Sequence, residues 1–447
     1  MCAAFAQLLV DYGGKPDLRT RRVAKLRCAS VDSTSPVPKY VQRGGCLYVV
    51  PYEIFRVLNV KERWSTEPIA QVLARELVGT SLEEWNTFFA SGLIREWRGR
   101  DEEGAVRRDR HTSLSSFQLM PAVSPRAVLT QGTRLIHRYH AHERPVRFPT
   151  QVSTSDQRHQ ACGGIVSLLG INERAGVAAV TKLANVPVTP CGLYNYNSVL
   201  ALLRVFVPEL GSYNSPHPVH RLDGPVTGVC LFALSEKAAS QLTEKFRARR
   251  IRKMYLAETA GFFDHEETVC DAPLSVQTQV DFISGRRHRI GVVDFQNGSH
   301  ASTHIRRLLR YKTDHGEARS LLLVEPRTGR THQIRCHLAH LGFPIVKDTR
   351  FEYKSARGPL PGVLPSATFE EETMSRETMH LELATGSALL CPHCPRLGVK
   401  DRSFANDASA IHLHAHRYWD IDGSLDFTAE LPSWMSGFEE SLEGRHL

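Results

Sequence analysis

The chain has 447 residues, of which 42% are hydrophobic and 23% charged, proportions that are ordinary for globular proteins. This length allows a large core and predicts two or more domains. No apolar run approaches the ~18 residues that a transmembrane helix needs, so we expect no membrane partner. The net charge of +9 and the pI near 9.1 favour a polyanionic partner, with RNA or DNA as the first candidates.

The ten cysteines are scattered along a chain without a secretory signal pattern, which indicates a reducing compartment rather than a disulfide framework. Residues 1–39 predict a flexible or targeting arm. Its basic residues would suit a mitochondrial presequence, whereas Asp11 and Asp17 do not. We therefore expect an intracellular protein and leave cytoplasm, nucleus and mitochondrion open.

Two short helices are predicted in the next region, residues 40–150. Residues 68–77 carry apolar side chains at helical spacing, with Pro68 at the first turn. Ser81 and Glu84 form a capping box at the start of a second helix, which stops at Gly92. This pair predicts a small α-rich region that resembles an S4-like RNA-binding module, with a generic helical pair as the alternative.

The most informative stretch is His-Arg-Leu-Asp-Gly-Pro-Val-Thr-Gly at residues 220–228. In an extended chain Arg221 and Asp223 point to one side, and His220 and Leu222 point to the other. A carboxylate beside a guanidinium, followed by Gly-Pro, suggests an acid displayed where a strand turns into a loop. Taken alone, such a pair is more often a weak surface ion pair.

A helix capped by Ser235 is expected next, and it leads into a dense basic block. The block spans residues 245–253 and has two interpretations, a solvated surface or a row of contacts to phosphates. We expect RNA-backbone contacts from four of its residues, namely Arg249, Arg250, Arg252 and Lys253. Tyr255 follows in a strand-like run, where an aromatic ring beside cations can stack on a base.

A second informative stretch spans residues 326–342, Pro-Arg-Thr-Gly-Arg-Thr-His-Gln-Ile-Arg-Cys-His-Leu-Ala-His-Leu-Gly. It follows a predicted buried strand at residues 321–324, and Thr331 is expected to cap a helix that ends at Gly342. Arg330 would lie at the turn and Arg335 in the first turns of the helix. Two arginines near a helix N-terminus favour an anion, with ordinary surface arginines as the alternative.

Together, these stretches resemble the RluA-type pseudouridine synthases. The family's His-Arg-Leu-Asp motif stands at residues 220–223, its Lys-x-Tyr strand at 253–255, and its Thr-Gly-Arg-Thr-His-Gln-Ile-Arg motif at 328–335. The order and spacing match. Pro-Cys-Gly at 190–192, His-Glu-Arg-Pro-Val at 142–146 and Leu-His-Ala at 413–415 resemble the eukaryotic branch, which acts mainly on tRNA.

The resemblance implies an α+β fold whose catalytic domain, residues 155–435, is bipartite around a central mixed, mainly antiparallel sheet. Residues 352–410 are polar and low in pattern, which predicts a variable insertion in that domain, and residues 436–447 are expected to form a tail. The resemblance also implies a protein that binds tRNA or rRNA. We expect it to be a monomer and to need no cofactor.

The resemblance also assigns roles to single residues. Asp223 matches the family's essential aspartate, and Arg335 matches the arginine that pairs with it. Tyr255 matches the tyrosine that packs on the target base, and Arg221 matches the residue that fills the space left by the flipped base. An ionised carboxylate can attack C1′ of the sugar or remove a C2′ proton, and a neighbouring arginine keeps it ionised.

The sequence departs from the family at residues 224–227, where Gly-Pro-Val-Thr replaces the usual Arg-x-Thr-Ser. Lys347 also stands where a small residue or Asn is common. These departures leave open an alternative function, a catalytically weak or inactive RNA-binding or ribosome-assembly factor on the same scaffold.

We expect no metal site. The Cys-x-x-Cys pair Cys391 and Cys394 would need a borrowed histidine to bind zinc, and the spacing of His137, His140 and His142 fits no metal motif. A zinc deaminase, which His-Leu-Glu at 380–382 could begin, is set aside. The proline of that signature is missing before Cys391, and the gap is too short for the intervening strand.

Overall fold

The computed structural model describes residues 28–29, 39–43, 46–77, 80–97, 114–147, 160–161, 166–192, 194–207, 210, 216–280, 287–351 and 410–438. Cys391, Cys394 and the segment at 380–382 lie outside these ranges, as does nearly all of the expected insertion. In the part of the chain that the structure covers, no helix has the length and apolar character needed to cross a membrane.

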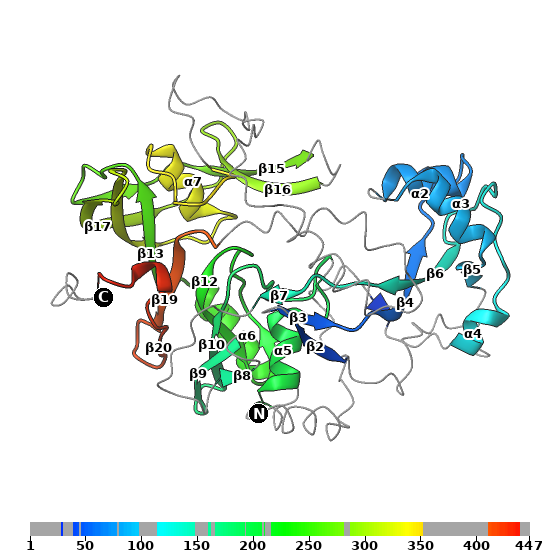
Figure 1. Cartoon of the computed structure of the whole chain (residues 1–447), viewed down its shortest axis with the longest axis horizontal. Coiled ribbons are helices and arrows are strands. Elements are labelled where there is room, and N and C mark those ends of the chain that lie inside the picture. The colour runs from blue at the N-terminus through cyan, green and yellow to red at the C-terminus, as the bar shows by residue number, and fades with distance from the viewer. Residues whose placement is uncertain are drawn as a thin grey trace.

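An eleven-stranded sheet organises the C-terminal two thirds of the chain (Figure 1). Its order is β14-β17-β18-β13-β19-β12-β10-β9-β8, and β11 and β20 pair beside β12 and β19. The bounds along this path are Glu267–Cys270, Thr303–Lys312, Ala318–Pro326, Ile251–Ala260, Leu413–Asp420, Thr227–Ala233, Val177–Lys182, Val166–Asn172 and Gln160–Ala161, with β11 at His217–Pro218 and β20 at Asp426–Thr428. Only β12 and β19 pair in parallel among the described strands, which confirms a mixed, mainly antiparallel sheet in an α+β fold.

The central strands are apolar because both of their faces are covered. Along β12, Val229 and Leu231 belong to one hydrophobic cluster, whereas Cys230 and Phe232 belong to another on the opposite face. Such alternation between two cores is what a strand with period two requires when it is buried on both sides. The strand that follows the aspartate motif is therefore anchored from above and below.

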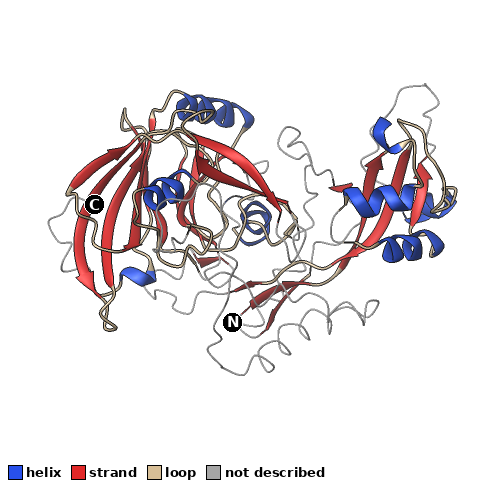
Figure 2. Ribbon diagram, turned by 90° about the horizontal axis from the view of Figure 1, so that it is seen from above, coloured by secondary structure: helices blue, strands red, loops and turns tan. Residues whose placement is uncertain are grey.

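Three helices pack on this sheet, and Figure 2 shows how they lie against its faces. They are α5 (Val199–Phe206), α6 (Glu236–Arg247) and α7 (Gln333–His340). Ser235 caps α6 as predicted, because its hydroxyl accepts a hydrogen bond from the backbone N–H of Ala238. The predicted cap of α7 by Thr331 is wrong. The N-cap is His332, whose backbone is left-handed and whose side chain makes no cap hydrogen bond.

A two-stranded hairpin stands apart from the main sheet beside α7 (Figure 1). It consists of β15 (Leu274–Val280) and β16 (Arg287–Val293). Gly291 in β16 passes so close to α7 that an added Cβ would lie 2.2 Å from the carbonyl oxygen of Thr331. The hairpin is therefore seated directly on the turn that begins α7.

The N-terminal region is a mixed unit built on a four-stranded antiparallel sheet, in the order β1-β4-β6-β5. Its elements are β1 (Cys28–Ala29), β4 (Tyr52–Asn59), η1 (Glu62–Trp64), α2 (Ile69–Glu76), α3 (Leu82–Ala90), β5 (Ile94–Trp97), α4 (Leu114–Leu119) and β6 (Arg134–Ala141). The capping box of Ser81 and Glu84 is present as predicted. The expected α-rich character is wrong, because β4 and β6 pair across all eight of their residues and supply the apolar surface under α2 and α3.

A small sheet joins this unit to the main sheet. It consists of β2 (Tyr40–Arg43), β3 (Cys46–Val49) and β7 (Val146–Arg147), and its apolar side chains share a hydrophobic cluster with α5. The Glu143 carboxylate accepts hydrogen bonds from the Tyr52 hydroxyl and from the backbone N–H groups of Asn195, Tyr196 and Asn197. One buried carboxylate thus links the first residue of β4 to the loop before α5.

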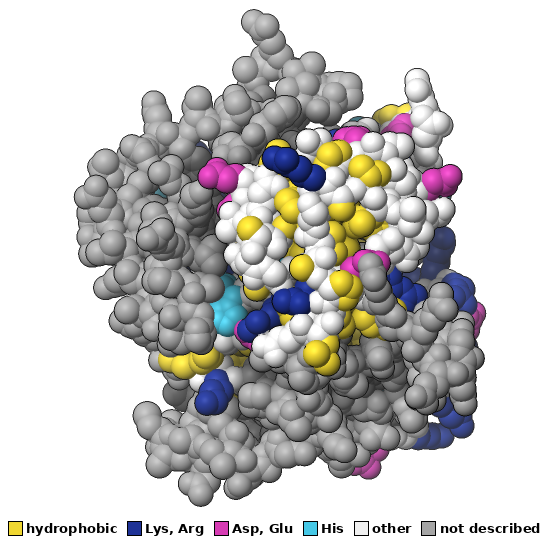
Figure 3. Space-filling view, turned by 90° about the vertical axis from the view of Figure 1, so that its right-hand side faces the viewer, with side chains coloured by type: hydrophobic (Ala, Val, Ile, Leu, Met, Phe, Trp, Pro, Cys, Tyr) yellow, Lys and Arg dark blue, Asp and Glu magenta, His cyan; other side chains and the backbone are white. Residues whose placement is uncertain are grey.

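Figure 3 views the molecule from the side of the N-terminal unit. On this face hydrophobic side chains lie between scattered single charges, and neither sign forms a continuous patch in the part that is coloured. Among the coloured residues, positive charge is therefore not concentrated on this face. The C-terminal segment η7 (Ser433–Met435) lies on the other side of the molecule, where Met435 packs into the cluster around Leu256 and Leu308.

Candidate active site

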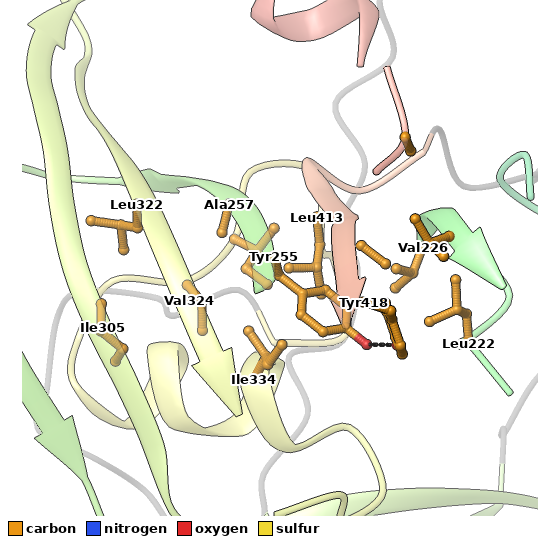
Figure 4. Close-up of a cluster of buried hydrophobic side chains, with 14 of the residues drawn as sticks. Leu222, Val226, Tyr255, Ala257, Ile305, Leu322, Val324, Ile334, Leu413 and Tyr418 are labelled. Atoms are coloured by element: carbon orange, nitrogen blue, oxygen red, sulfur yellow. Dashed lines mark hydrogen bonds between the residues drawn. The ribbon is translucent and has the colours of Figure 1, made fainter. Parts of the chain in front are cut away.

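Asp223 lies in the loop between β11 and β12, with its carboxylate partly exposed. The buried side chains of Leu222 and Val226 fix the loop to the core on either side of the carboxylate (Figure 4). Within the loop, the backbone N–H of Val226 donates to the Asp223 carbonyl at 3.2 Å. The backbone around this acid is therefore held, while its carboxylate remains partly accessible.

Lys182, the last residue of β10, also holds this loop. Its side chain is fully buried, and Nζ donates to the carbonyl oxygens of Leu183 and Gly224, each at 2.9 Å. Burial lowers the pKa of Lys182 to about 7, although the charges of Cys230 and Asp223 act to raise it. The prediction from sequence missed this residue. In the sequence, this role is signalled only by the position of a lysine at the end of an apolar strand.

Gly228 brings the aspartate loop against β19. Its φ is +110°, and an added Cβ would lie 2.1 Å from the carbonyl oxygen of Ala415. Beside it, the Thr227 hydroxyl and Nδ1 of His414 form a hydrogen bond of 2.7 Å. The parallel pairing of β12 and β19 therefore begins immediately after the loop and depends on a residue without a side chain.

His220 anchors the other side of the loop. Its Nε2 accepts a hydrogen bond of 2.8 Å from the backbone N–H of Leu231, and its ring stacks on Tyr418. Since a backbone N–H can only donate, Nε2 carries no proton in this bond. Burial lowers the pKa of His220 to about 3, with a further contribution from Lys253. The first residue of the motif is therefore a neutral structural histidine.

These buried histidines predict that the protein loses stability in mild acid. Burial also lowers the pKa of His414 to about 3, so His220 and His414 both stay neutral in the fold. The unfolded chain takes up these protons below pH ~6.5, and each histidine then removes ~1.4 kcal/mol per pH unit until its folded pKa is reached. The urea midpoint should therefore fall steadily from pH 7 to pH 4.5. An unchanged midpoint would contradict this assignment.

Arg335, in the first turns of α7, faces two carboxylates. Its Nε and Nη2 each bind Asp348 at 2.6 Å, while Nη1 lies 3.4 Å from Oδ2 of Asp223. The Phe351 ring covers the guanidinium at 4.7 Å. Burial opposes the charge, but Asp348 and then Asp223 raise the pKa of Arg335. Asp348 therefore orients the guanidinium so that its Nη1 group faces Asp223.

No role was predicted for Asp348 from the sequence. It is almost fully buried, as is Arg335. The neighbouring Lys347 has a left-handed backbone, with φ of 65°. Asn and Gly adopt that conformation most readily, which explains why Lys347 stands out at this position.

Tyr255 lies in β13 and is largely enclosed between Leu222, Ile334 and Tyr418 (Figure 4). Its hydroxyl hydrogen-bonds that of Tyr418 at 2.6 Å. Burial raises the pKa of Tyr255, so the phenol stays protonated at neutral pH. The structure brings Tyr255, Asp223 and Arg335 to one place from three separate stretches of the sequence.

The other predicted substrate-binding residues lie at the edge of this site. Arg221 is exposed. Burial raises the pKa of the Cys191 thiol, and the positive charge of Arg221 acts to lower it. Arg330 is exposed, and its Nε donates to the carbonyl oxygen of His300 at 3.0 Å. Its backbone N–H donates to Gln333, which fixes the turn before α7.

The basic block does not present a uniform row of charges. Arg250 is paired with Asp422 at 2.6 Å, whereas Arg249 is exposed in a left-handed turn and Arg252 is exposed on β13. Lys253 points inward, and its Nζ donates to the Thr328 carbonyl at 3.3 Å. Burial lowers the pKa of Lys253 to about 8. Lys253 therefore lines the site, and Arg249 and Arg252 are the exposed members of the four predicted RNA-contacting residues.

Comparisons with known proteins find relatives that modify RNA. Residues 176–340 match the family model described as RNA pseudouridylate synthase. RNA pseudouridine synthase 7 of Oryza sativa subsp. japonica is 27% identical over 88% of this chain and 91% of its own length. The tRNA pseudouridine(31) synthase of Saccharomyces cerevisiae is 26% identical over 90% of this chain and 98% of its own length.

Over residues 176–340 the chain is therefore similar to the RluA-type RNA pseudouridine synthases, and the two relatives extend this similarity over most of its length. Among solved structures, it matches Human RNA Pseudouridylate Synthase Domain Containing 4 with a TM-score of 0.39 and 22% identity, over 62% of this chain and 91% of that one.

Proposed function

We propose that this RNA pseudouridine synthase isomerises specific uridines in tRNA, with Asp223 as its catalytic carboxylate. The observation that carries the proposal is the position of Asp223. This acid is partly exposed, and the buried guanidinium of Arg335 faces it. Nη1 of Arg335 lies 3.4 Å from Oδ2 of Asp223. Attack on a sugar requires a negatively charged carboxylate, and the guanidinium of Arg335 places an opposite charge beside it.

The reaction needs only this carboxylate and a protein surface that holds the base. The bond between N1 and C1′ breaks, the uracil rotates, and C5 bonds to C1′ while the C5 proton leaves and N1 gains one. Asp223 would either bond to C1′ until the rotated base displaces it, or take the C2′ proton and later return it. The enclosed ring of Tyr255 offers the base an apolar contact, and the exposed Arg221, two residues before Asp223, is proposed to fill the vacated stack.

The proposal that tRNA is the substrate rests on two relatives. The yeast tRNA pseudouridine(31) synthase aligns over 98% of its length, and the yeast mitochondrial tRNA pseudouridine(32) synthase is 24% identical over 67% of this chain. Both names concern tRNA. In this proposal residues 40–150 act as an S4-like RNA-binding region, residues 155–435 form the catalytic domain with an insertion at 352–410, and the protein works as an intracellular monomer.

A direct test uses the purified full chain with unmodified tRNA and rRNA transcripts. Pseudouridine is mapped at single-nucleotide resolution, with Asp223→Asn as the inactive control. We expect conversion of a small set of tRNA uridines and none in rRNA. Tight RNA binding without conversion in either RNA would instead favour the assembly-factor function.

Arg249 and Arg252 are proposed to contact RNA phosphates, because they are the exposed members of the four predicted RNA-contacting residues. Replacing both with alanine should weaken RNA binding and reduce the slope of log affinity against log salt by about 1 to 2, since each phosphate contact contributes ~0.7 to 0.9. The matched control is Arg174→Ala with Lys237→Ala. It removes the same charge from exposed positions near the opposite end of α6. Equal slopes for the two double variants would show that the basic block does not contact RNA.

A further inference from the structure

We propose that His332 is a second positioning residue for Asp223, a neutral hydrogen-bond donor held in place by the β15–β16 hairpin. The proposal rests on the proposed role of Asp223 and adds a residue that the motif comparison left without a function. Nε2 of His332 lies 3.8 Å from Oδ2 of Asp223, the same oxygen that Arg335 faces. The imidazole and the guanidinium thus converge on one carboxylate oxygen.

The hydrogen bond on the other side of the ring decides which nitrogen carries the proton. Nδ1 of His332 accepts from the backbone N–H of Gly291 at 3.3 Å. A backbone N–H cannot accept, so Nδ1 is unprotonated and the proton of the neutral ring is on Nε2. That N–H is the one that faces Asp223. The hairpin therefore selects the tautomer that can donate to the catalytic carboxylate.

The charged groups around the ring keep it neutral. Burial lowers the pKa of His332, and Arg335 and Arg350 lower it further, while Asp223 and Asp348 oppose them. A neutral ring adds a donor to Asp223 without adding a second full positive charge beside Arg335. Protonation in acid would put a proton on Nδ1 as well, facing the N–H of Gly291, so the bond that orients the ring would be lost.

The backbone at His332 is held in a conformation that a histidine rarely adopts. Its φ is 54° and its ψ is 27°, at the N-cap of α7. A non-glycine residue in this region costs about 1 kcal/mol or more, and such residues persist where their surroundings hold them. Here the strained turn points the imidazole back toward Asp223, which a regular cap residue would not do.

Gly291 supplies the surroundings that hold this turn. Its carbonyl oxygen accepts a hydrogen bond from Sγ of Cys336 at 3.1 Å, so both of its backbone polar groups bind the start of α7. An added Cβ would collide with the Thr331 carbonyl oxygen at 2.2 Å. The side chain of His332 therefore connects the hairpin to the Asp223 carboxylate.

The test replaces His332 with glycine, which accepts the left-handed backbone and removes only the imidazole. We expect a 10- to 100-fold lower single-turnover rate of pseudouridine formation, with RNA affinity within twofold of wild type. Free imidazole should restore part of the lost rate, and the acid side of the pH–rate profile should change. Thr331→Ala, in the same turn, is the matched control and should keep the wild-type rate and profile.

A second variant, Gly291→Ala, should displace the hairpin and lower the rate by a similar factor. Its effect should largely disappear when it is combined with His332→Gly, because both remove the same contact. A His332→Gly rate within twofold of wild type, beside an inactive Asp223→Asn, would overturn the role of His332 and leave the proposed function standing. An active Asp223→Asn would instead overturn the proposed function itself.

Discussion

Replacing Asp223 with asparagine is expected to lower the rate of pseudouridine formation by about 10⁴-fold or more, because the reaction loses its nucleophile or base. The amide has nearly the same shape, but it carries no charge with which to attack C1′ or take a C2′ proton. Arg335 keeps both of its hydrogen bonds to Asp348, so no buried charge is left without a partner. Folding and RNA binding should therefore survive the change.

The measurement is a single-turnover assay with enzyme in excess over tRNA, combined with RNA affinity and thermal unfolding. Asp264→Asn provides the control, since this aspartate is mostly exposed and lies at a distant turn. It should leave all three quantities unchanged. If Asp223→Asn retained more than a tenth of the wild-type rate, another residue would have to carry the chemistry.

The largest loss of stability is expected from Gly228→Ala. Its backbone φ of +110° is strained for any residue with a side chain, and the new Cβ would lie 2.1 Å from the carbonyl oxygen of Ala415. Relief requires β12 and β19 to separate where they pair in parallel, next to the aspartate loop. We expect a loss of ~3 kcal/mol or more, visible as a lower urea midpoint or as insoluble protein.

Gly224→Ala is the matched control for that experiment. It lies in the same loop and in the stretch that departs from the family, but an added Cβ there meets nothing within 4 Å. Its φ does not lie in the left-handed region. We expect unchanged or slightly higher stability, because alanine restricts the unfolded chain. Equal urea midpoints for the two variants would show that the contact at Gly228 is not tight.

Most elements near the site follow from local signals in the sequence. The apolar run at 321–324 lies in β18, and Ser235 caps α6. Burial on both faces makes such strands apolar throughout, and a cap depends on three or four neighbouring residues, so a short window is sufficient to find them. The place of Asp223 before β12 follows in the same way.

Features that depend on distant partners were not predictable in this way. The N-terminal sheet pairs β4 with β6, whose residues are some eighty positions apart, so the two helices between them suggested an α-rich region. Arg250 is paired with Asp422 across the fold, and nothing near Arg250 in the sequence signals this partner. The start of α7 at His332 rather than Thr331 depends on Gly291 from another strand.

The buried carboxylate of Glu143 has a consequence for how the enzyme measures its substrate. It binds the hydroxyl of Tyr52, where β4 begins, and three successive N–H groups before α5. A hinge at this point would have to leave a buried negative charge without partners, which is costly. These contacts therefore oppose motion of the N-terminal unit relative to the catalytic sheet at this point. Under the proposed function, an RNA bound by the N-terminal unit would present to Asp223 only the uridine at the matching distance.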